Sequence, residues 1–314
     1  MKNMATTDDR DVDSSRYPVR HVRLTGADLA YVDAGKSGAP VVLLVHGWPE
    51  TKRIWWRNIE AVASAGFRVL APDLRGFGDS SLARDGFYDV ASHSRDLHAL
   101  VAHVTGAARC IAVGGDLGGV IIQDLGARFP GFVARQVLFN CPLPYLKEQM
   151  RDIPDTRPLL EATDYFIRQG TDADALAAEL ADDGMRRRYV ATFYSSRFWA
   201  APGTFDPRAI AFMVEPFADG AKLRASFTNY ETVFDPSKVS EKPLVGRSEI
   251  PTVILFGPHD RVIYPAFDRM AAVVFQNHVG PFSVRDAGHF MQWEAASVLN
   301  SAVIAFCSDL KRHD

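Results

Sequence analysis

The feature of this sequence that most limits its possible folds is an alternation of short apolar runs with amphipathic segments. Residues 40–45 and 251–257 are apolar on both faces, which is typical of strands in a parallel sheet covered by helices on both sides. Between about residues 141 and 245 the alternation stops, and the chain is helical, aromatic and interrupted by proline. The pattern predicts an α/β fold with one helical insertion.

The expected fold has three parts: a tail, a core and an inserted cap. The tail is polar and acidic, and we expect it to be disordered. Two alternating segments at the start of the core, 17–24 and 27–34, are expected to pair as strands. The expected bounds are 1–15 for the tail, 16–140 with 246–314 for the core, and 141–245 for the helical cap.

Composition excludes several classes of protein. The 314 residues are 47% apolar and carry a formal net charge of −3, which offers no basic surface for nucleic acid or an anionic membrane. Three scattered cysteines predict neither a disulfide framework nor a zinc site. Neither a signal-peptide pattern nor a membrane-length apolar run is visible. We therefore expect a cytoplasmic protein without nucleic-acid or membrane partners.

Chemistry-bearing residues follow four of the predicted strands. In open α/β sheets, ligands bind beyond the carboxyl ends of the strands, so these segments should meet at one edge. The chain thereby supplies Asp116, Asp260 and His289, in that order, to a single site. The four segments are HGWP (46–49), GGDLGG (114–119), PHD (258–260) and AGH (287–289).

Asp116 stands among four glycines, where a strand turns into a helix. Such a turn has the geometry of a nucleophile elbow, and the helix N-terminus favours an ionised carboxylate. A carboxylate can attack carbon to form an ester, which water activated by His289 and oriented by Asp260 could hydrolyse. The alternative roles are a phosphate loop, whose glycine spacings do not fit, a structural histidine and an Asx turn at Asp260.

These motifs, in this order, resemble the α/β-hydrolase superfamily and, within it, the epoxide hydrolases. The similarity covers about residues 17–311 and also includes the segment DLRGFGDS at 73–80. It implies an α/β-hydrolase fold with a mostly parallel sheet, helices on both faces and an inserted helical cap. The implied reaction opens an epoxide to a vicinal diol and needs neither a metal nor an organic cofactor.

The resemblance also implies roles for matching residues. Asp116 would be the nucleophile, and His289 would activate water with support from Asp260. The backbone N–H groups of Trp48 and Leu117 would form the oxyanion hole, where each donor is worth about 3 kcal/mol of barrier.

The loop after the strand at 40–45 and the elbow each carry a further expectation. We expect His46, Gly47 and Pro49 to shape that loop rather than to transfer protons, and the Trp48–Pro49 bond to be cis, as in relatives. Gly115 stands where a histidine often precedes the nucleophile. This departure from the family pattern predicts different packing beneath the elbow.

Epoxide opening in the family uses two cap tyrosines whose hydroxyls donate to the epoxide oxygen. Tyr230 matches the second of these positions. Tyr165 lies in the region of the first, although an alternative alignment puts Ala162 there and leaves Tyr165 as packing. Tyr145 and Tyr194 are the other candidates.

Two other enzyme families also use an aspartate at this position. Haloalkane dehalogenases usually follow it with tryptophan, and haloacetate dehalogenases with arginine and a second arginine three residues on. Here those positions are Leu117 and Val120, so both binding groups are missing.

A non-catalytic small-molecule-binding protein is the alternative of a different class. The expected partner is a small apolar organic epoxide, and a homodimer is compatible with the sequence.

Overall fold

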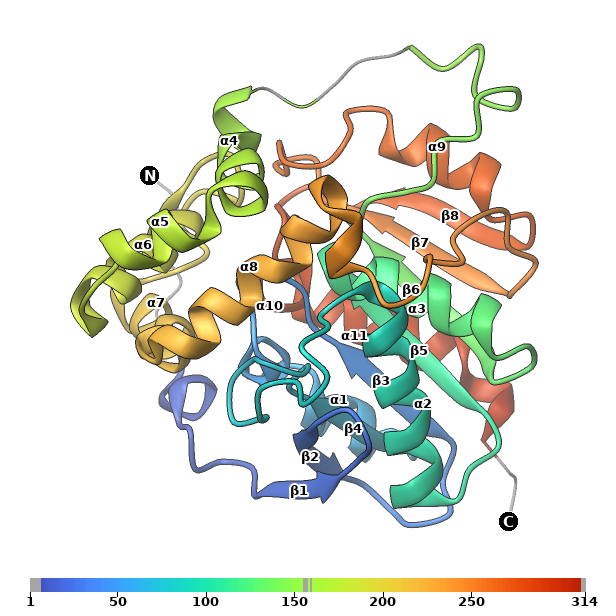
Figure 1. The fold of residues 1–314 in the computed structure, drawn as a ribbon. Coiled ribbons are helices and arrows are strands. Elements are labelled where there is room, and N and C mark those ends of the chain that lie inside the picture. Colours follow the sequence, from blue (N-terminus) through green and yellow to red (C-terminus); the bar gives the residue numbers. More distant parts are fainter. Residues whose placement is uncertain (1–6, 155–157, 159, 312–314) are drawn as a thin grey trace.

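The computed structural model of the chain describes residues 7–154, 158 and 160–311 (Figure 1). Its centre is an eight-stranded sheet with the order β1-β2-β4-β3-β5-β6-β7-β8. The strands are β1 (Val19–Arg23), β2 (Asp28–Ala34), β3 (Val41–Val45), β4 (Arg68–Pro72), β5 (Cys110–Gly115), β6 (Val133–Phe139), β7 (Thr252–Phe256) and β8 (His278–Ser283).

The sheet is mostly parallel, as the alternation of segments predicts. Only β2 runs against its neighbours, pairing antiparallel with β1 and with β4. The remaining neighbours pair in parallel. Every residue of β3 and β5 is buried, because helices cover both faces of the central strands. The predicted pairing of segments 17–24 and 27–34 is confirmed by the β1–β2 register.

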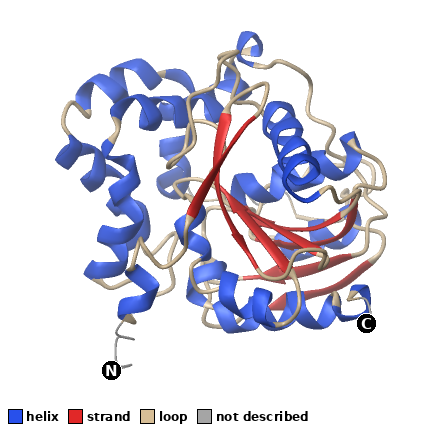
Figure 2. Ribbon diagram, turned by 90° about the horizontal axis from the view of Figure 1, so that it is seen from below, coloured by secondary structure: helices blue, strands red, loops and turns tan. Residues whose placement is uncertain are grey.

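Helices lie on both faces of the sheet (Figures 1 and 2). On one face α2 and α3 pack against each other, and α1 packs with α11 on the other. The predicted α/β-hydrolase fold class is thereby confirmed in its architecture. The core helices are α1 (Ile59–Ser64), α2 (Val90–Thr105), α3 (Asp116–Arg128), α9 (Phe267–Val274), α10 (Met291–Glu294) and α11 (Ala296–Phe306).

A second group of helices comes between β6 and β7 and lies together to the left of the sheet in Figure 1. No strand occurs among the described residues of this group. We call these five helices the helical segment. They are α4 (Leu160–Thr171), α5 (Ala173–Glu179), α6 (Asp183–Ser195), α7 (Pro207–Val214) and α8 (Gly220–Phe234).

Acidic caps begin several of these helices. The side chains of Asp89, Asp182, Asp206 and Asp219 each accept a hydrogen bond from a backbone N–H in the first turn of α2, α6, α7 and α8. Each cap satisfies one of the N–H groups that a helix leaves without an internal partner. Gly106 ends α2 in the left-handed conformation, with φ of 66°.

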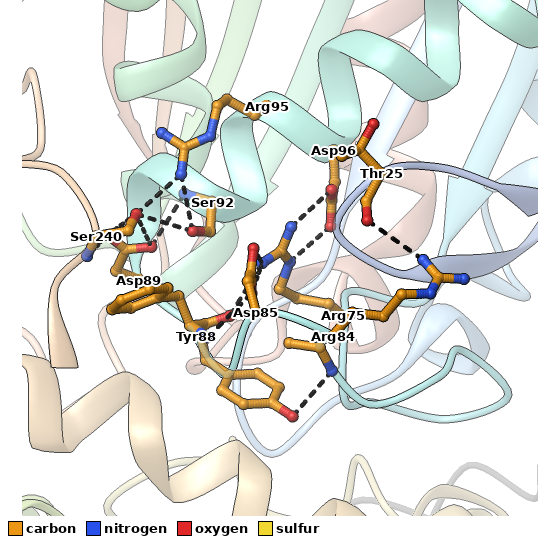
Figure 3. Close-up of polar contacts among 12 residues, drawn as sticks. Thr25, Arg75, Arg84, Asp85, Tyr88, Asp89, Ser92, Arg95, Asp96 and Ser240 are labelled. Atoms are coloured by element: carbon orange, nitrogen blue, oxygen red, sulfur yellow. Dashed lines mark hydrogen bonds and ion pairs between the residues drawn. The ribbon is translucent and has the colours of Figure 1, made fainter.

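A polar network fixes the N-terminal end of α2 (Figure 3). The Arg75 guanidinium donates to both carboxylate oxygens of Asp96, at 2.6 and 2.7 Å, and also to Asp85. Asp89 accepts from the backbone N–H of Ser240 at 2.8 Å. The chain returning from the helical segment to β7 is therefore tied to the core where α2 begins.

The prediction of a disordered tail is wrong for residues 7–15. Asp9–Val12 forms a short 3₁₀ helix, and the carboxylate of Asp11 pairs with Arg57 at 2.7 Å. These acidic residues have basic partners far along the chain, which composition alone does not reveal. Residues 1–6 lie outside the described part of the chain.

Candidate active site

The elbow between β5 and α3 presents Asp116 at the carboxyl edge of the sheet. Asp116 adopts a left-handed backbone conformation, with φ of 48°, and its N–H donates to the carbonyl of Asn140 at 2.9 Å. A side chain at position 118 would place its Cβ 2.3 Å from the carbonyl oxygen of Val45. Glycine at 118 therefore lets α3 approach β3 closely enough to hold the carboxylate above the sheet.

Gly115, the departure noted in the sequence, packs against an aromatic ring. A Cβ at this position would lie 2.2 Å from Cε2 of Phe139, at the end of β6. The ring therefore occupies the space that a side chain before the nucleophile would need.

The structure brings together the three residues expected to carry the chemistry. Asp116 Oδ1 accepts from the backbone N–H of Trp48 at 2.8 Å, and Oδ2 lies 3.3 Å from Nε2 of His289. His289 Nδ1 lies 2.8 Å from Oδ2 of Asp260. Asp260 Oδ1 also accepts from the N–H of Val262 at 2.7 Å, which fixes the carboxylate. The Asp116 side chain remains 13% exposed, whereas the other two members are buried.

The two carboxylates control the charge of His289. Burial lowers its pKa, but the negative charges of Asp260 and Asp116 outweigh burial and hold that pKa well above 6.5. With Asp260 at Nδ1, that nitrogen keeps its proton and Nε2 is the one that exchanges protons. Nε2 is buried and makes no well-aligned hydrogen bond within the described residues, although Asp116 is close.

The loop after β3 has the features expected of it. Burial lowers the pKa of His46 to about 4, so the ring is neutral. Its Nδ1 contacts the carbonyl of Gly47 at 2.8 Å, and its Nε2 accepts from the N–H of Leu74 at 3.0 Å. The Trp48–Pro49 bond is cis, which confirms that expectation. The Leu117 N–H is among the first four of α3, which have no carbonyl partner inside a helix.

Two glutamates that we did not identify from the sequence, the buried Glu50 and the partly buried Glu294, bind backbone N–H groups of these loops. Glu50 accepts from the N–H of Gly47 and from the amide of Gln292, each at 2.6 Å. Glu294 accepts from the N–H of Gly288 at 2.8 Å. Burial raises the pKa of each to about 7. Glu50 could have been identified as the acidic residue directly after the HGWP motif. No local sequence pattern identifies Glu294.

Tyr165 on α4 and Tyr230 on α8 meet over the site. Their ring centroids are 5.6 Å apart, and the two rings meet edge to face. Tyr165 also stacks on Trp48, with centroids 5.5 Å apart and planes 6° apart. Burial, together with the nearby charge of Asp116, raises the pKa of both phenols well above 10. Both hydroxyls therefore stay protonated and able to donate.

The other candidates for a proton donor lie elsewhere. The Tyr194 hydroxyl donates to the carbonyl of Pro49 at 2.5 Å and is buried there. Tyr145 is 62% exposed. Ala162 is buried one turn before Tyr165 on the same helix. The geometry therefore favours Tyr165, rather than Tyr194 or Tyr145, as the partner of Tyr230.

A cavity of about 280 Å³ opens beside Tyr165, between α4 and α6. Trp199 reaches from its wall to the edge of His289, with ring centroids 4.6 Å apart. In the sequence, no spacing among the aromatic residues distinguishes Trp199 from its neighbours. Four aromatic residues line it, Tyr165, Tyr189, Phe193 and Trp199, together with Ala162 and five polar or charged residues: Glu161, Asp164, Arg168, Thr192 and Ser196.

An aspartate on a strand-to-helix elbow, facing a histidine–aspartate pair, is an arrangement of the α/β-hydrolase type. A family model described as alpha/beta hydrolase fold matches residues 40–296. This chain belongs to the α/β-hydrolase fold family. Among the described residues, no helix is long and apolar enough to cross a membrane, and no group of three His, Cys, Asp or Glu side chains could hold a metal ion.

Within the α/β-hydrolases, several of the similar proteins are named epoxide hydrolases. Epoxide hydrolase A of Mycobacterium tuberculosis is 30% identical, over 93% of this chain and 98% of its own length. Soluble epoxide hydrolase of a Corynebacterium species is 27% identical, over 92% of this chain and 96% of its own. The solved structure of epoxide hydrolase CorEH without ligand has a TM-score of 0.78 and 25% identity, covering 93% of this chain and 99% of that one. The resemblance to the epoxide hydrolases is therefore confirmed.

Proposed function

We propose that this enzyme opens an epoxide to a vicinal diol through an ester on Asp116. The observation that carries the proposal is the position of the Asp116 carboxylate, which contacts His289 and the Trp48 N–H beneath a pair of protonated tyrosines. The family relationship and the names of the relatives support an epoxide as the substrate.

In the first step, an Asp116 oxygen attacks one epoxide carbon and the bond from that carbon to the ring oxygen breaks. Tyr230 or Tyr165 donates its proton to the leaving oxygen, which becomes the hydroxyl of a hydroxy-ester. The tyrosine is left as a phenolate, with the ring of the second tyrosine beside it. The two phenols thus supply the proton that an epoxide oxygen needs at neutral pH.

Ester formation prepares the second step electrostatically. It neutralises Asp116 and so removes one of the two carboxylates that raise the pKa of His289. His289 can then give its Nε2 proton to the phenolate, and the neutral Nε2 takes a proton from water as the water oxygen attacks the ester carbonyl. The Trp48 N–H, which already contacts Asp116 Oδ1 at 2.8 Å, and the Leu117 N–H would hold the oxyanion. Collapse releases the diol and restores the Asp116 carboxylate, while His289 keeps the proton taken from water and is again in its resting state.

The surroundings of the site favour an apolar substituent on the epoxide. Trp48, Phe193 and Trp199 surround Tyr165 at ring-centroid distances of 5.1 to 5.5 Å. Pockets of this kind bind through apolar area, with a few polar groups fixing orientation. The dehalogenase alternatives lack a comparable feature, since Leu117 offers no side-chain donor to a halide or a carboxylate.

The test is to trap the ester in His289→Gln. This variant should form the ester and fail to hydrolyse it. After exposure to aryl and alkyl epoxides, haloalkanes and fluoroacetate, mass spectrometry of the whole protein and of its peptides would locate any adduct. We expect an adduct on Asp116 with the full mass of an epoxide. An adduct lacking one hydrogen halide would make the protein a dehalogenase, and folded protein without any adduct would contradict the proposal.

A further inference from the structure

Asn140 touches all three loops that carry the reacting residues. It is completely buried and follows β6, with a left-handed φ of 36°. Its backbone carbonyl accepts from the N–H of Asp116 at 2.9 Å. Its side-chain oxygen accepts from the N–H of Gly257 at 2.9 Å, and its side-chain nitrogen donates to the carbonyl of Gly288 at 2.5 Å.

The two glycines lie directly beside the acid and the base. Gly257 begins the turn that carries Asp260, and the Asp260 N–H donates back to the Gly257 carbonyl at 3.0 Å. Gly288 immediately precedes His289. The side-chain amide of Asn140 therefore links the loop that carries Asp260 to the loop that carries His289.

The contacts of Asn140 require an amide at this position. The group must donate on one side and accept on the other, which neither a carboxylate nor an apolar side chain can do. The approach is also tight, because a Cβ on residue 257 would lie 2.4 Å from the Gly288 carbonyl oxygen and 2.9 Å from Asn140 Nδ2. Asparagine is in addition one of the few non-glycine residues that accept a left-handed φ readily.

We propose that Asn140 is the positioning residue that sets the Asp260–His289 pair in register with Asp116. The inference rests on the proposed function, since it concerns the step in which His289 activates water. Asn140 itself touches no reacting atom. Without its amide, a buried N–H and a buried carbonyl lose their partners, and the two loops shift to recover them.

The two chemical steps should respond differently to losing the amide. Formation of the ester depends on the elbow. The hydrogen bond from the Asp116 N–H goes to the backbone carbonyl of residue 140, which every substitution retains. Hydrolysis depends on the 2.8 Å contact between His289 and Asp260 and on the position of Nε2. A small displacement of a catalytic group costs about ten- to a hundredfold in rate. Loss of the amide should therefore slow hydrolysis selectively.

The experiment compares Asn140→Gly with the wild type, using the epoxide that gives the Asp116 adduct. Glycine keeps the left-handed backbone and removes only the amide. Single-turnover measurements would give both rates, normalised to the folded, ester-forming fraction. We expect ester formation within about threefold of the wild type and hydrolysis about ten- to a hundredfold slower, so that ester accumulates. The pH midpoint of hydrolysis should move down, because His289 loses part of its support from Asp260.

Two further variants keep the test decisive. Asn140→Asp retains the acceptor and loses the donor, so it should slow hydrolysis in the same way. Asn58→Ala is the matched control, because Asn58 is also buried and donates from its amide to Asn300 at 2.8 Å, away from the site. It should lose stability without changing the ratio of the two rates or the pH midpoint.

The outcomes separate this inference from the proposed function. Two results would show that Asn140 does not position the Asp260–His289 pair: equal slowing of both steps with an unchanged pH midpoint, or slowing of neither step. The ester mechanism would stand in both cases. If neither the wild type nor His289→Gln ever forms an ester, the proposed function fails first and this inference fails with it.

Discussion

At the residue scale, the site depends on which groups hold their protons. The phenols of Tyr165 and Tyr230 keep theirs because burial raises their pKa, and the Asp116 carboxylate beneath them accepts a hydrogen bond from the Trp48 N–H. His289 lies between two carboxylates that make it more basic. The arrangement thus places proton donors on one side of the nucleophile and a base on the other.

Removing one phenol should affect only the ring-opening step. In Tyr230→Phe, we expect ester formation to slow about a hundredfold, because a general acid is lost, while hydrolysis of the ester keeps its rate. Single-turnover kinetics would measure the two steps separately. The control is Tyr145→Phe, because that side chain is exposed to solvent. Equal loss in both steps would mean that Tyr230 supports the fold of the site and does not donate.

The raised pKa of His289 should make stability depend on pH. The folded state binds this proton more tightly than the unfolded chain, so its stabilisation is complete below the unfolded pKa of 6.5 and is lost as pH rises through the folded pKa. Above pH 6.5, the free energy of unfolding should fall more steeply with rising pH in the wild type than in His289→Gln. Urea unfolding across that range measures both slopes. Parallel slopes would show that the pKa of His289 is not raised.

At the scale of secondary-structure elements, the elbow depends on the close packing of β5 against β6. The Phe139 ring at the end of β6 fills the space beside Gly115, so the residue before the nucleophile cannot carry a side chain without displacing the ring. The same ring packs against Trp55 at a centroid distance of 6.2 Å. Packing beneath the nucleophile therefore continues into the core.

Gly115→Ala should consequently destabilise the protein. A Cβ 2.2 Å from a buried ring must push it aside, and overpacking of this kind costs about 1–3 kcal/mol. Phe139→Leu in the same chain should restore part of the loss by making room. Urea unfolding of the single and double variants tests this, and an unchanged stability in Gly115→Ala would contradict the packing argument.

Local patterns were sufficient to predict the sheet and the elbow. Apolar runs predict β3 and β7, because central parallel strands are buried on both faces. The segment PFSVRD (281–286) predicts the final strand, but β8 spans His278–Ser283, because an edge strand is partly exposed and lacks the fully apolar pattern. The sequence near residues 293–311 predicts one final helix, but Ala295 separates α10 from α11. Asn140 and Glu294 were not identified, because their roles arise only where distant loops meet.

At the scale of the whole molecule, the helical segment and the core build one site together. The Trp48 indole donates to Ser226 on α8 at 3.0 Å, which fixes the helix that carries Tyr230. The Trp199 carbonyl accepts from the His289 N–H at 2.7 Å, so the segment also holds the base. The acid that opens the ring and the base that hydrolyses the ester thus depend on the same contacts between the two parts.

The measurement that tests the central claim most directly is a single turnover in H₂¹⁸O with enzyme in excess of epoxide. If water attacks the carbonyl of an Asp116 ester, the diol takes an original oxygen of the carboxylate, and the heavy oxygen stays on the enzyme. We predict an unlabelled diol and one heavy oxygen in the peptide that contains Asp116. A labelled diol with an unlabelled Asp116 would show that water opens the epoxide directly, and would contradict the ester mechanism.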